Sequence, residues 1–269
     1  MPRAAHRMSA IEHANLVTVR VEARPAGHVA HVTVNNPEKR NALGLAGKQQ
    51  LAQAFRRLAR DRLLRVAVLT GAGDRSFMAG ADIAEMKDLT PKEANAVHTG
   101  VHRVCEAIRA LPVPVIARIN GYCFGAGMEI AAACDMRIAV SSAKFGMPEV
   151  RFGIPSGMEA CLLPQLIGWG KTRELVFTGD HLDAAEAHRC GFLEKMVEPA
   201  GLDPGVEQWV SSILAAGARA IRLQKALVRD WERMTIKQAV QAGIRACTDA
   251  RRTDEPRRLM AAFLERRKK

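Results

Sequence analysis

Alternating apolar and polar positions near the start of the chain predict a β-hairpin. Residues 16–21 and 30–34 each alternate between the two kinds of side chain, and Pro25-Ala26-Gly27 lies between them. Two period-two runs around a Pro/Gly turn are typical of paired antiparallel strands. Asn35-Asn36-Pro37 ends the second run.

Further along the chain, short apolar runs alternate with segments whose apolar residues recur at helical intervals. Leu51, Phe55 and Leu58 recur at helical intervals with arginines between them. Buried strands are expected at residues 66–70, 112–119 and 136–140, and further helices at 91–110 and 128–134. From about residue 184 onward, helical patterns dominate. This order predicts an α/β core with a partly parallel sheet, followed by a helical region.

Size and cysteine usage narrow the class of protein. Of 269 residues, 48% are hydrophobic, which excludes general disorder. No apolar run reaches the ~18 residues that a membrane helix needs. The first ten residues are basic but lack the apolar stretch of a secretory signal. Six cysteines lie far apart without a C-x-x-C pair, so free thiols and a cytoplasmic location are expected.

The net charge of +12 admits three interpretations. It can attract nucleic acid, a phosphorylated small molecule, or nothing beyond solvent, because the cations are spread along the chain. The chain has only 12 aromatic residues (3 Trp, 1 Tyr and 8 Phe), and none forms a nucleic-acid-binding motif. Nucleic acid is therefore the least favoured partner.

Several familiar motifs are incomplete. Gly71-Ala72-Gly73 follows a strand, but the rest of a dinucleotide fingerprint is missing. There is no Walker A sequence and no nucleophile-elbow serine. His98 and His102 lie four residues apart on an expected helix, a spacing that can hold a metal ion. Since no third ligand is nearby, we expect packed or solvated histidines and no metal site.

Two loops rich in small residues follow the first two buried strands. They are residues 77–83 and residues 120–129, and the second runs directly into a helix. Small residues let backbone N–H groups approach a ligand closely, and a helix start directs its N–H groups outward. One N–H from each loop could form an oxyanion hole. Two tight turns beside a core helix are the alternative.

Two glutamates stand in apolar surroundings. Glu129 lies in the first turn of a mostly apolar helix, and Glu149 follows Phe145-Gly146-Met147-Pro148. Burial raises the pKa of a carboxyl group toward the range that acid–base catalysis near neutral pH requires. The alternatives are a dipole-stabilised charge for Glu129 and a surface salt bridge for Glu149.

Taken together, these segments resemble the crotonase (enoyl-CoA hydratase/isomerase) superfamily over nearly the whole chain. The resemblance rests on the order and spacing of Asn36-Pro37, Arg40-Asn41-Ala42-Leu43, residues 77–83, residues 120–129, Cys134-Asp135, residues 145–149 and residues 262–267. It implies a spiral of ββα units followed by a helical trimerisation region. We accordingly expect residues 1–200 to form the core with a CoA-thioester site. Residues 201–269 would then mediate assembly into homotrimers or hexamers.

The resemblance also assigns roles to residues. The N–H groups of Ala81 and Ala126 match the oxyanion-hole positions, where they would hold the thioester oxygen. Glu129 would take a proton from the water that adds to C3, and Glu149 would supply the proton to C2. The implied reaction is hydration of a 2-enoyl-CoA. Other crotonase activities, such as isomerase or hydratase-lyase, and an RNA-binding hydratase relative are the alternatives.

Further positions match contacts with the substrate. No tightly bound cofactor is implied, because coenzyme A enters as part of the substrate. Phe263 and Arg266 match a tail that reaches the nucleotide of a neighbouring subunit's CoA, and Met86 matches an acyl-pocket position. The remaining expected CoA contacts are Arg40, Ala42, Ala79, Gly80, Asp82, Ile83 and Gly125. Turn capping explains Asp82, Asn120 and Asp135 equally well.

Three departures from the family pattern concern the loops. Ala126 stands where glycine is usual, and Met78 where a smaller residue is common. The largest departure is residues 153–161, a tract that is one residue shorter and less glycine-rich than in many hydratases. Because this tract borders the acyl pocket in the family, the acyl group is left open. Glu159 within it is expected to be a surface residue.

Overall fold

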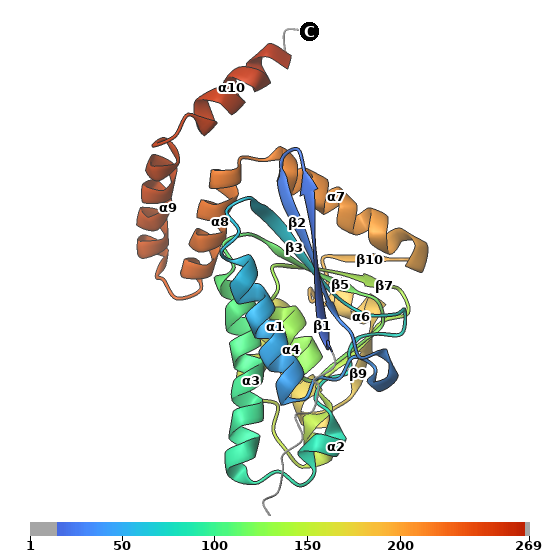
Figure 1. The fold of residues 1–269 in the computed structure, drawn as a ribbon. Helices are drawn as coiled ribbons and strands as arrows, with labels where there is room; N and C mark the ends of the chain where they lie inside the picture. The colour runs from blue at the N-terminus through green and yellow to red at the C-terminus, as the bar shows by residue number, and fades with distance from the viewer. Residues whose placement is uncertain (1–14, 267–269) are drawn as a thin grey trace, which may run out of the picture.

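A six-stranded sheet is the main scaffold of the computed structural model, which describes residues 15–266 (Figure 1). Its strand order is β1-β2-β3-β5-β7-β10. The β1–β2 pair is antiparallel, and the other pairs are parallel. The strands are β1 (Val17–Arg24), β2 (Gly27–Val34), β3 (Leu64–Gly71), β5 (Val115–Ile119), β7 (Met136–Val140) and β10 (Lys195–Val197).

A second sheet of three-residue strands continues from the first. Its order is β4-β6-β8-β9, with β8 and β9 antiparallel. The strands are β4 (Ser76–Met78), β6 (Tyr122–Phe124), β8 (Lys144–Gly146) and β9 (His181–Asp183). The pairs β3/β4, β5/β6 and β7/β8 each contribute one strand to each sheet, and helices separate the pairs. This repeat confirms the expected spiral of ββα units.

Helices cover the main sheet on both sides. In Figure 1, α1, α3 and α4 lie on one side and α7 lies on the other. The first eight α-helical and 3-10 segments are η1 (Pro37–Lys39), α1 (Leu45–Leu58), α2 (Ile83–Met86), α3 (Pro91–Ala110), α4 (Ala126–Ala133), η2 (Pro148–Phe152), η3 (Met158–Leu162) and α5 (Leu163–Thr178). The others are α6 (Ala184–Arg189), η4 (Pro199–Gly201), α7 (Leu202–Ala215), α8 (Ala218–Trp231), α9 (Ile236–Ala250) and α10 (Glu255–Arg266).

The predicted elements are present with small shifts at their ends. The hairpin pairs Val17 with Val34 and Arg24 with Gly27. Val66, Ala67 and Leu69 of β3 are fully buried, as the continuous apolar run predicts. The short strands β4, β6, β8 and β9 were not predicted. The region after residue 184 is mostly helical, although β10 interrupts it.

The last helices expose apolar side chains. Figure 1 shows α10 extending away from the rest of the molecule. Ile236 on α9 is 82% exposed, and Val240, Ile244, Met260 and Phe263 are all more than half exposed. The division at residue 200 and the assembly role of this region stay predictions. None of the helices within residues 15–266 is long and apolar enough to cross a bilayer.

Asn41 links the segment after β2 to the loop between β3 and β4. It is fully buried and adopts a left-handed conformation, φ 58°. Its side-chain amide donates to the carbonyl oxygens of Ala72 (3.0 Å) and Ser76 (2.7 Å), and its Oδ1 accepts from the Asn36 N–H at 3.0 Å. The Arg40 carbonyl accepts in turn from Ala79 N–H at 3.0 Å. Residues 36–43 are thereby held against the loop that begins at Met78.

We predict that Asn41→Ala lowers the free energy of unfolding by about 2–4 kcal/mol, because one buried and two partly buried polar groups lose their partner. Urea unfolding followed by circular dichroism measures this. Asn35→Ala, at an exposed neighbouring position, is the control. Equal stabilities for the two variants would contradict the role given to Asn41.

Candidate active site

One cavity brings together both small-residue loops and both glutamates. Its volume is about 410 Å³. Its walls come from the loop after β4, helices α2 and α3, the loop after β6, the start of α4 and the segment after β8. Ala81, Ala126, Glu129 and Glu149 all line it. The four residues to which the sequence assigns chemistry therefore face one space.

The two loops lie side by side because β4 and β6 pair in parallel. A Cβ on Gly80 would lie 2.9 Å from the Phe124 carbonyl oxygen and 3.7 Å from the Ala126 nitrogen. Gly80 also has φ 98°, so a side chain is excluded on two grounds. Neither the Ala81 nor the Ala126 N–H donates to an acceptor among the described residues. Both donors are left for a ligand in the cavity, and alanine at position 126 keeps its N–H.

Glu129 is buried in the first turn of α4, with 1% of its surface exposed. Its Oε1 accepts a hydrogen bond from the Ala160 N–H at 3.0 Å, and its Oε2 has no partner among the described residues. Burial raises the pKa of Glu129 to about 8, and the Ala160 N–H offsets only part of this effect. The neighbouring Glu149 adds to the rise. Glu129 therefore holds a proton at neutral pH.

Glu149 reaches the cavity from η2. Its Oε2 accepts from the Ser156 hydroxyl at 2.7 Å. Its Oε1 lies over Gly125, where a Cβ would be only 2.4 Å away. Gly125 has φ 51°, so glycine is needed there both for the backbone and for the approach of the carboxylate. Burial raises the pKa of Glu149 as well, and the Ser156 hydroxyl lowers it. The salt bridge considered for Glu149 is not present among the described residues.

The arrangement can exchange protons with a ligand near neutral pH. Two carboxyls with raised pKa values face the same cavity, and their charges repel. Glu129 is the more deeply buried, and its pKa of about 8 keeps a proton on it near neutral pH. A proton held by Glu129 gives the site a donor, and an ionised Glu149 beside it would be an acceptor.

Residues 153–161, the tract that differs most from the family pattern, contact both carboxyls. Ser156 and Ala160 make the hydrogen bonds to Glu149 and Glu129, and Ile154 and Met158 line the cavity between them. Met158 has φ 40°, an uncommon conformation for a residue with a side chain. The tract therefore borders the cavity, and its place at an acyl pocket stays a prediction. Ser156 had no assigned role in the sequence, where nothing marked it as a partner of Glu149.

The prediction for Glu159 was wrong. Its side chain is buried, 7% exposed, and Oε1 bonds His102 Nδ1 at 2.7 Å. It lies in η3, which packs against α3 and α4, and the sequence pattern does not show that packing. His102 therefore pairs with a carboxylate, whereas His98 lines the cavity. Among the described residues no group of three His, Cys, Asp or Glu side chains could hold a metal ion.

The expected CoA contacts divide into two groups. Those that line the cavity are Arg40, Ala79, Gly80, Ile83, Met86 and Gly125. Arg40 is exposed at the mouth, with its guanidinium 5.4 Å from the centre of the Tyr122 ring. Ala42 does not line the cavity. Asp82 instead caps α2 through the Ala84 N–H (3.1 Å) and pairs with Lys39 at 2.5 Å, which fits the capping alternative.

The other residues considered as caps also have internal partners. The Asn120 amide donates to the carbonyl oxygens of Gly71 and Gly73, and Asp135 accepts from the Val115 N–H. Phe263 is 58% exposed on α10 and does not line the cavity of its own chain. Arg266 ends the same helix, and its side chain lies outside the described part. A role at a neighbouring subunit stays a prediction for both.

Lys48 is a cavity residue that the sequence interpretation missed. It lies on α1, 1% exposed, among the lining residues. The signal was present, because Leu51, Ala52 and Phe55 follow it at three, four and seven positions, the spacing of one buried helix face. A lysine at an apolar-face position indicates a buried cation.

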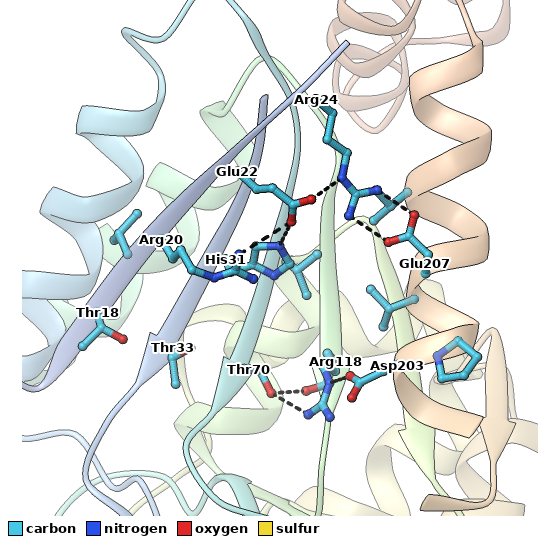
Figure 2. A pocket seen from close by; sticks show the side chains of 15 residues that line it. Thr18, Arg20, Glu22, Arg24, His31, Thr33, Thr70, Arg118, Asp203 and Glu207 are labelled. Atoms are coloured by element: carbon cyan, nitrogen blue, oxygen red, sulfur yellow. Dashed lines mark hydrogen bonds and ion pairs between the residues drawn. The ribbon is translucent and has the colours of Figure 1, made fainter. Parts of the chain in front are cut away.

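A larger hollow of about 810 Å³ lies elsewhere, against β1, β2, β3 and α7 (Figure 2). Its charged groups pair with one another. Arg24 binds Glu22 (2.7 Å) and Glu207 (2.6 Å), and Arg118 binds Asp203 at 2.6 Å. Hydrogen bonds from Arg24 lower the pKa values of Glu22 and Glu207, so both stay ionised and cannot exchange protons near neutral pH. The smaller cavity is therefore the better candidate for chemistry.

Comparison with known proteins gives consistent matches. A family model described as enoyl-CoA hydratase/isomerase matches residues 24–269. A crotonyl-CoA hydratase of Syntrophomonas wolfei is 38% identical over 241 residues, which cover 89% of this chain and 93% of the relative. A short-chain-enoyl-CoA hydratase of Clostridium acetobutylicum is 35% identical over 90% of this chain and 93% of its own. The crystal structure of an enoyl-CoA hydratase from Bacillus anthracis, 30% identical, superposes with a TM-score of 0.87 over 92% of this chain and 96% of that chain.

We predict that Glu129→Gln stabilises the fold at alkaline pH. The pKa of Glu129 is raised from 4.5 to about 8, so its stabilising protonation is complete below pH 4.5 and lost as the pH rises through 8. Between pH 5 and pH 9 the stability of the variant should gain about 2–5 kcal/mol relative to the parent. Urea unfolding at both pH values measures this.

Glu106→Gln, an exposed change on α3, serves as the control. If the two variants responded identically to pH, Glu129 would have an ordinary pKa.

Proposed function

Since this chain belongs to the enoyl-CoA hydratase/isomerase family and is an enoyl-CoA hydratase, we propose that Glu129 and Glu149 carry its proton transfers. The observation that supports this most strongly is their shared cavity, in which both carboxyls have raised pKa values and face two unpaired N–H donors. Hydration needs one group to take a proton from water and another to supply one to carbon. A single base would suffice for a simple isomerase.

The Ala81 and Ala126 N–H groups would bind the thioester oxygen. As water adds to C3, negative charge moves through C2 and the carbonyl carbon to that oxygen. Two N–H donors fixed at the ends of paired strands stabilise this charge without moving. Ala126 is the first residue of α4, so the positive end of the helix dipole adds to the effect.

The two carboxyls would complete a closed proton cycle. At rest the shared proton lies on Glu129, the more deeply buried group. Transfer through the bound water moves it to Glu149. Glu129 then accepts a proton from that water as its oxygen bonds to C3, and Glu149 gives its proton to C2. The product leaves Glu129 protonated and Glu149 ionised, which is the starting state.

The substrate would be a short 2-enoyl-CoA, since the two similar enzymes are named for crotonyl-CoA and short-chain enoyl-CoA. Such thioesters are intermediates of fatty acid metabolism, which we propose as the setting. Coenzyme A would enter as part of the substrate, with no other cofactor. The exposed Arg40 at the cavity mouth would meet its phosphates. We also propose a cytoplasmic location, which the six free cysteines, all among the described residues, support.

We predict that the protein removes the conjugated enoyl-thioester absorbance of crotonyl-CoA and that Glu149→Gln slows this by about 10²–10⁴-fold. Butyryl-CoA, which cannot react, should bind the variant within about threefold of the parent, because the neutral amide keeps the shape of the site. Stopped-flow absorbance and calorimetry measure the two quantities.

Glu198→Gln, an exposed change, is the matched control. Parental turnover by Glu149→Gln would remove Glu149 from the mechanism. No absorbance loss with crotonyl-CoA or longer 2-enoyl-CoA thioesters would overturn the hydratase assignment.

We also propose assembly into homotrimers or hexamers through α8, α9 and α10. The exposed apolar side chains of α9 and α10 support this, because patches of that kind are typical of interfaces. Sedimentation equilibrium should give three or six times the chain mass of 29.3 kDa. A monomeric mass at micromolar concentration would contradict the proposal.

A further inference from the structure

Lys48 places an unpaired cation at the wall of the candidate active site. It is 1% exposed and lines the same cavity as Glu129 and Glu149. Its Nζ has no hydrogen-bond partner among the described residues. Burying an ammonium group without a partner costs several kcal/mol. This nitrogen is therefore free to pair with an anionic group that enters the cavity.

The groups near Lys48 do not supply that partner. Glu85 and Glu129 raise its pKa through their charges, but Lys48 Nζ has no hydrogen-bond partner in the part of the chain that the structure describes. His98, on the α3 wall of the cavity, is neutral at pH 7, because burial and the charge of Lys48 lower its pKa. Burial lowers the pKa of Lys48 itself to about 8, so the ammonium form still predominates at pH 7.

Packing fixes where the ammonium group lies. The stem of Lys48 passes α3 at Gly100, where a Cβ would be 3.3 Å from the lysine Cδ. Leu51 and Phe55, on the same face of α1, are fully buried. The side chain cannot swing to solvent without opening the contact between α1 and α3. It is held as a fixed cation directed toward the cavity.

The position of Lys48 in the cavity indicates which part of a bound substrate would lie beside it. If the thioester oxygen meets Ala81 and Ala126, C3 lies toward Glu129. The CoA phosphates lie toward Arg40 at the mouth, so they are not the partner of Lys48. Met86, Val97 and Lys48 line the same cavity, so in this placement the acyl chain beyond C3 would extend among them.

We propose that the natural acyl group carries a carboxylate beyond C3 and that Lys48 pairs with it. This inference rests on the proposed hydratase function and names its substrate class. An ammonium–carboxylate pair in a cavity that excludes water is stronger than one at a surface. The apolar side chains around Lys48 would accommodate the methylene groups between C3 and the carboxylate.

The test compares two substrates that differ only in charge. Glutaconyl-CoA has a carboxylate whose carbon is C5, and 5-methylhex-2-enoyl-CoA replaces that carboxylate by a neutral isopropyl group of similar size. We expect kcat/KM to be at least about 10-fold higher for the charged substrate with the parent enzyme. In Lys48→Met this ratio should fall by about 50-fold or more, since the unpaired carboxylate would enter an apolar wall.

Lys92→Met, an exposed change on α3, is the matched control and should keep the parental ratio. A second measurement needs no variant: glutaryl-CoA should bind the parent at least about 10-fold more tightly than butyryl-CoA. A parent that hydrates crotonyl-CoA but prefers the neutral substrate, or a ratio unchanged in Lys48→Met, would overturn the carboxylate assignment and leave the hydratase function intact. A parent that hydrates none of the three thioesters and no longer 2-enoyl-CoA would overturn both.

Discussion

The burial of the Glu129 carboxyl at the start of α4 is the constraint on which the rest of the site depends. A carboxyl that is 1% exposed needs a donor or a proton, and Glu129 has both, the N–H of Ala160 and a pKa near 8. The donor comes from η3, so the segment after Glu149 must fold back over α4. That return path also brings Ser156 to Glu149. The desolvation of one side chain thus determines the course of the chain around the cavity.

The second, smaller sheet brings the other site residues to the cavity beside Glu129. Its strands β4, β6 and β8 are three residues long, and each delivers the segment after it to the cavity: Ala81, Ala126 and Glu149 follow them in turn. Parallel pairing places equivalent strand ends at one edge. Groups nearly 70 positions apart in the chain therefore meet without a long loop between them.

The sequence predicts the long elements and four residues that line one cavity, and it fails where a feature has no periodicity. The hairpin, β3, α3 and α4 have clear repeats of two or 3.6 residues. Three-residue strands are too short to show one. Glu159 looked like a surface residue because nothing in its own segment indicates that η3 packs against α3. Lys48 could have been found, since its spacing from Leu51 and Phe55 places it on the buried face of α1. The arrangement of Glu129 and Glu149 came from resemblance, because their meeting depends on strand pairing.

The tract from residue 153 to residue 160 supports the two carboxyls through Ser156 and Ala160, and it lines the cavity with Ile154 and Met158. Support of the carboxyls and lining of the cavity therefore depend on different residues of one short segment. The wall residues can be exchanged during divergence while the two supporting residues keep the proton chemistry in place. The length of the segment is less free, because a register shift would move both supports together. Selectivity for the acyl group can therefore evolve by replacement of side chains, and a change in loop length requires compensation at both glutamates.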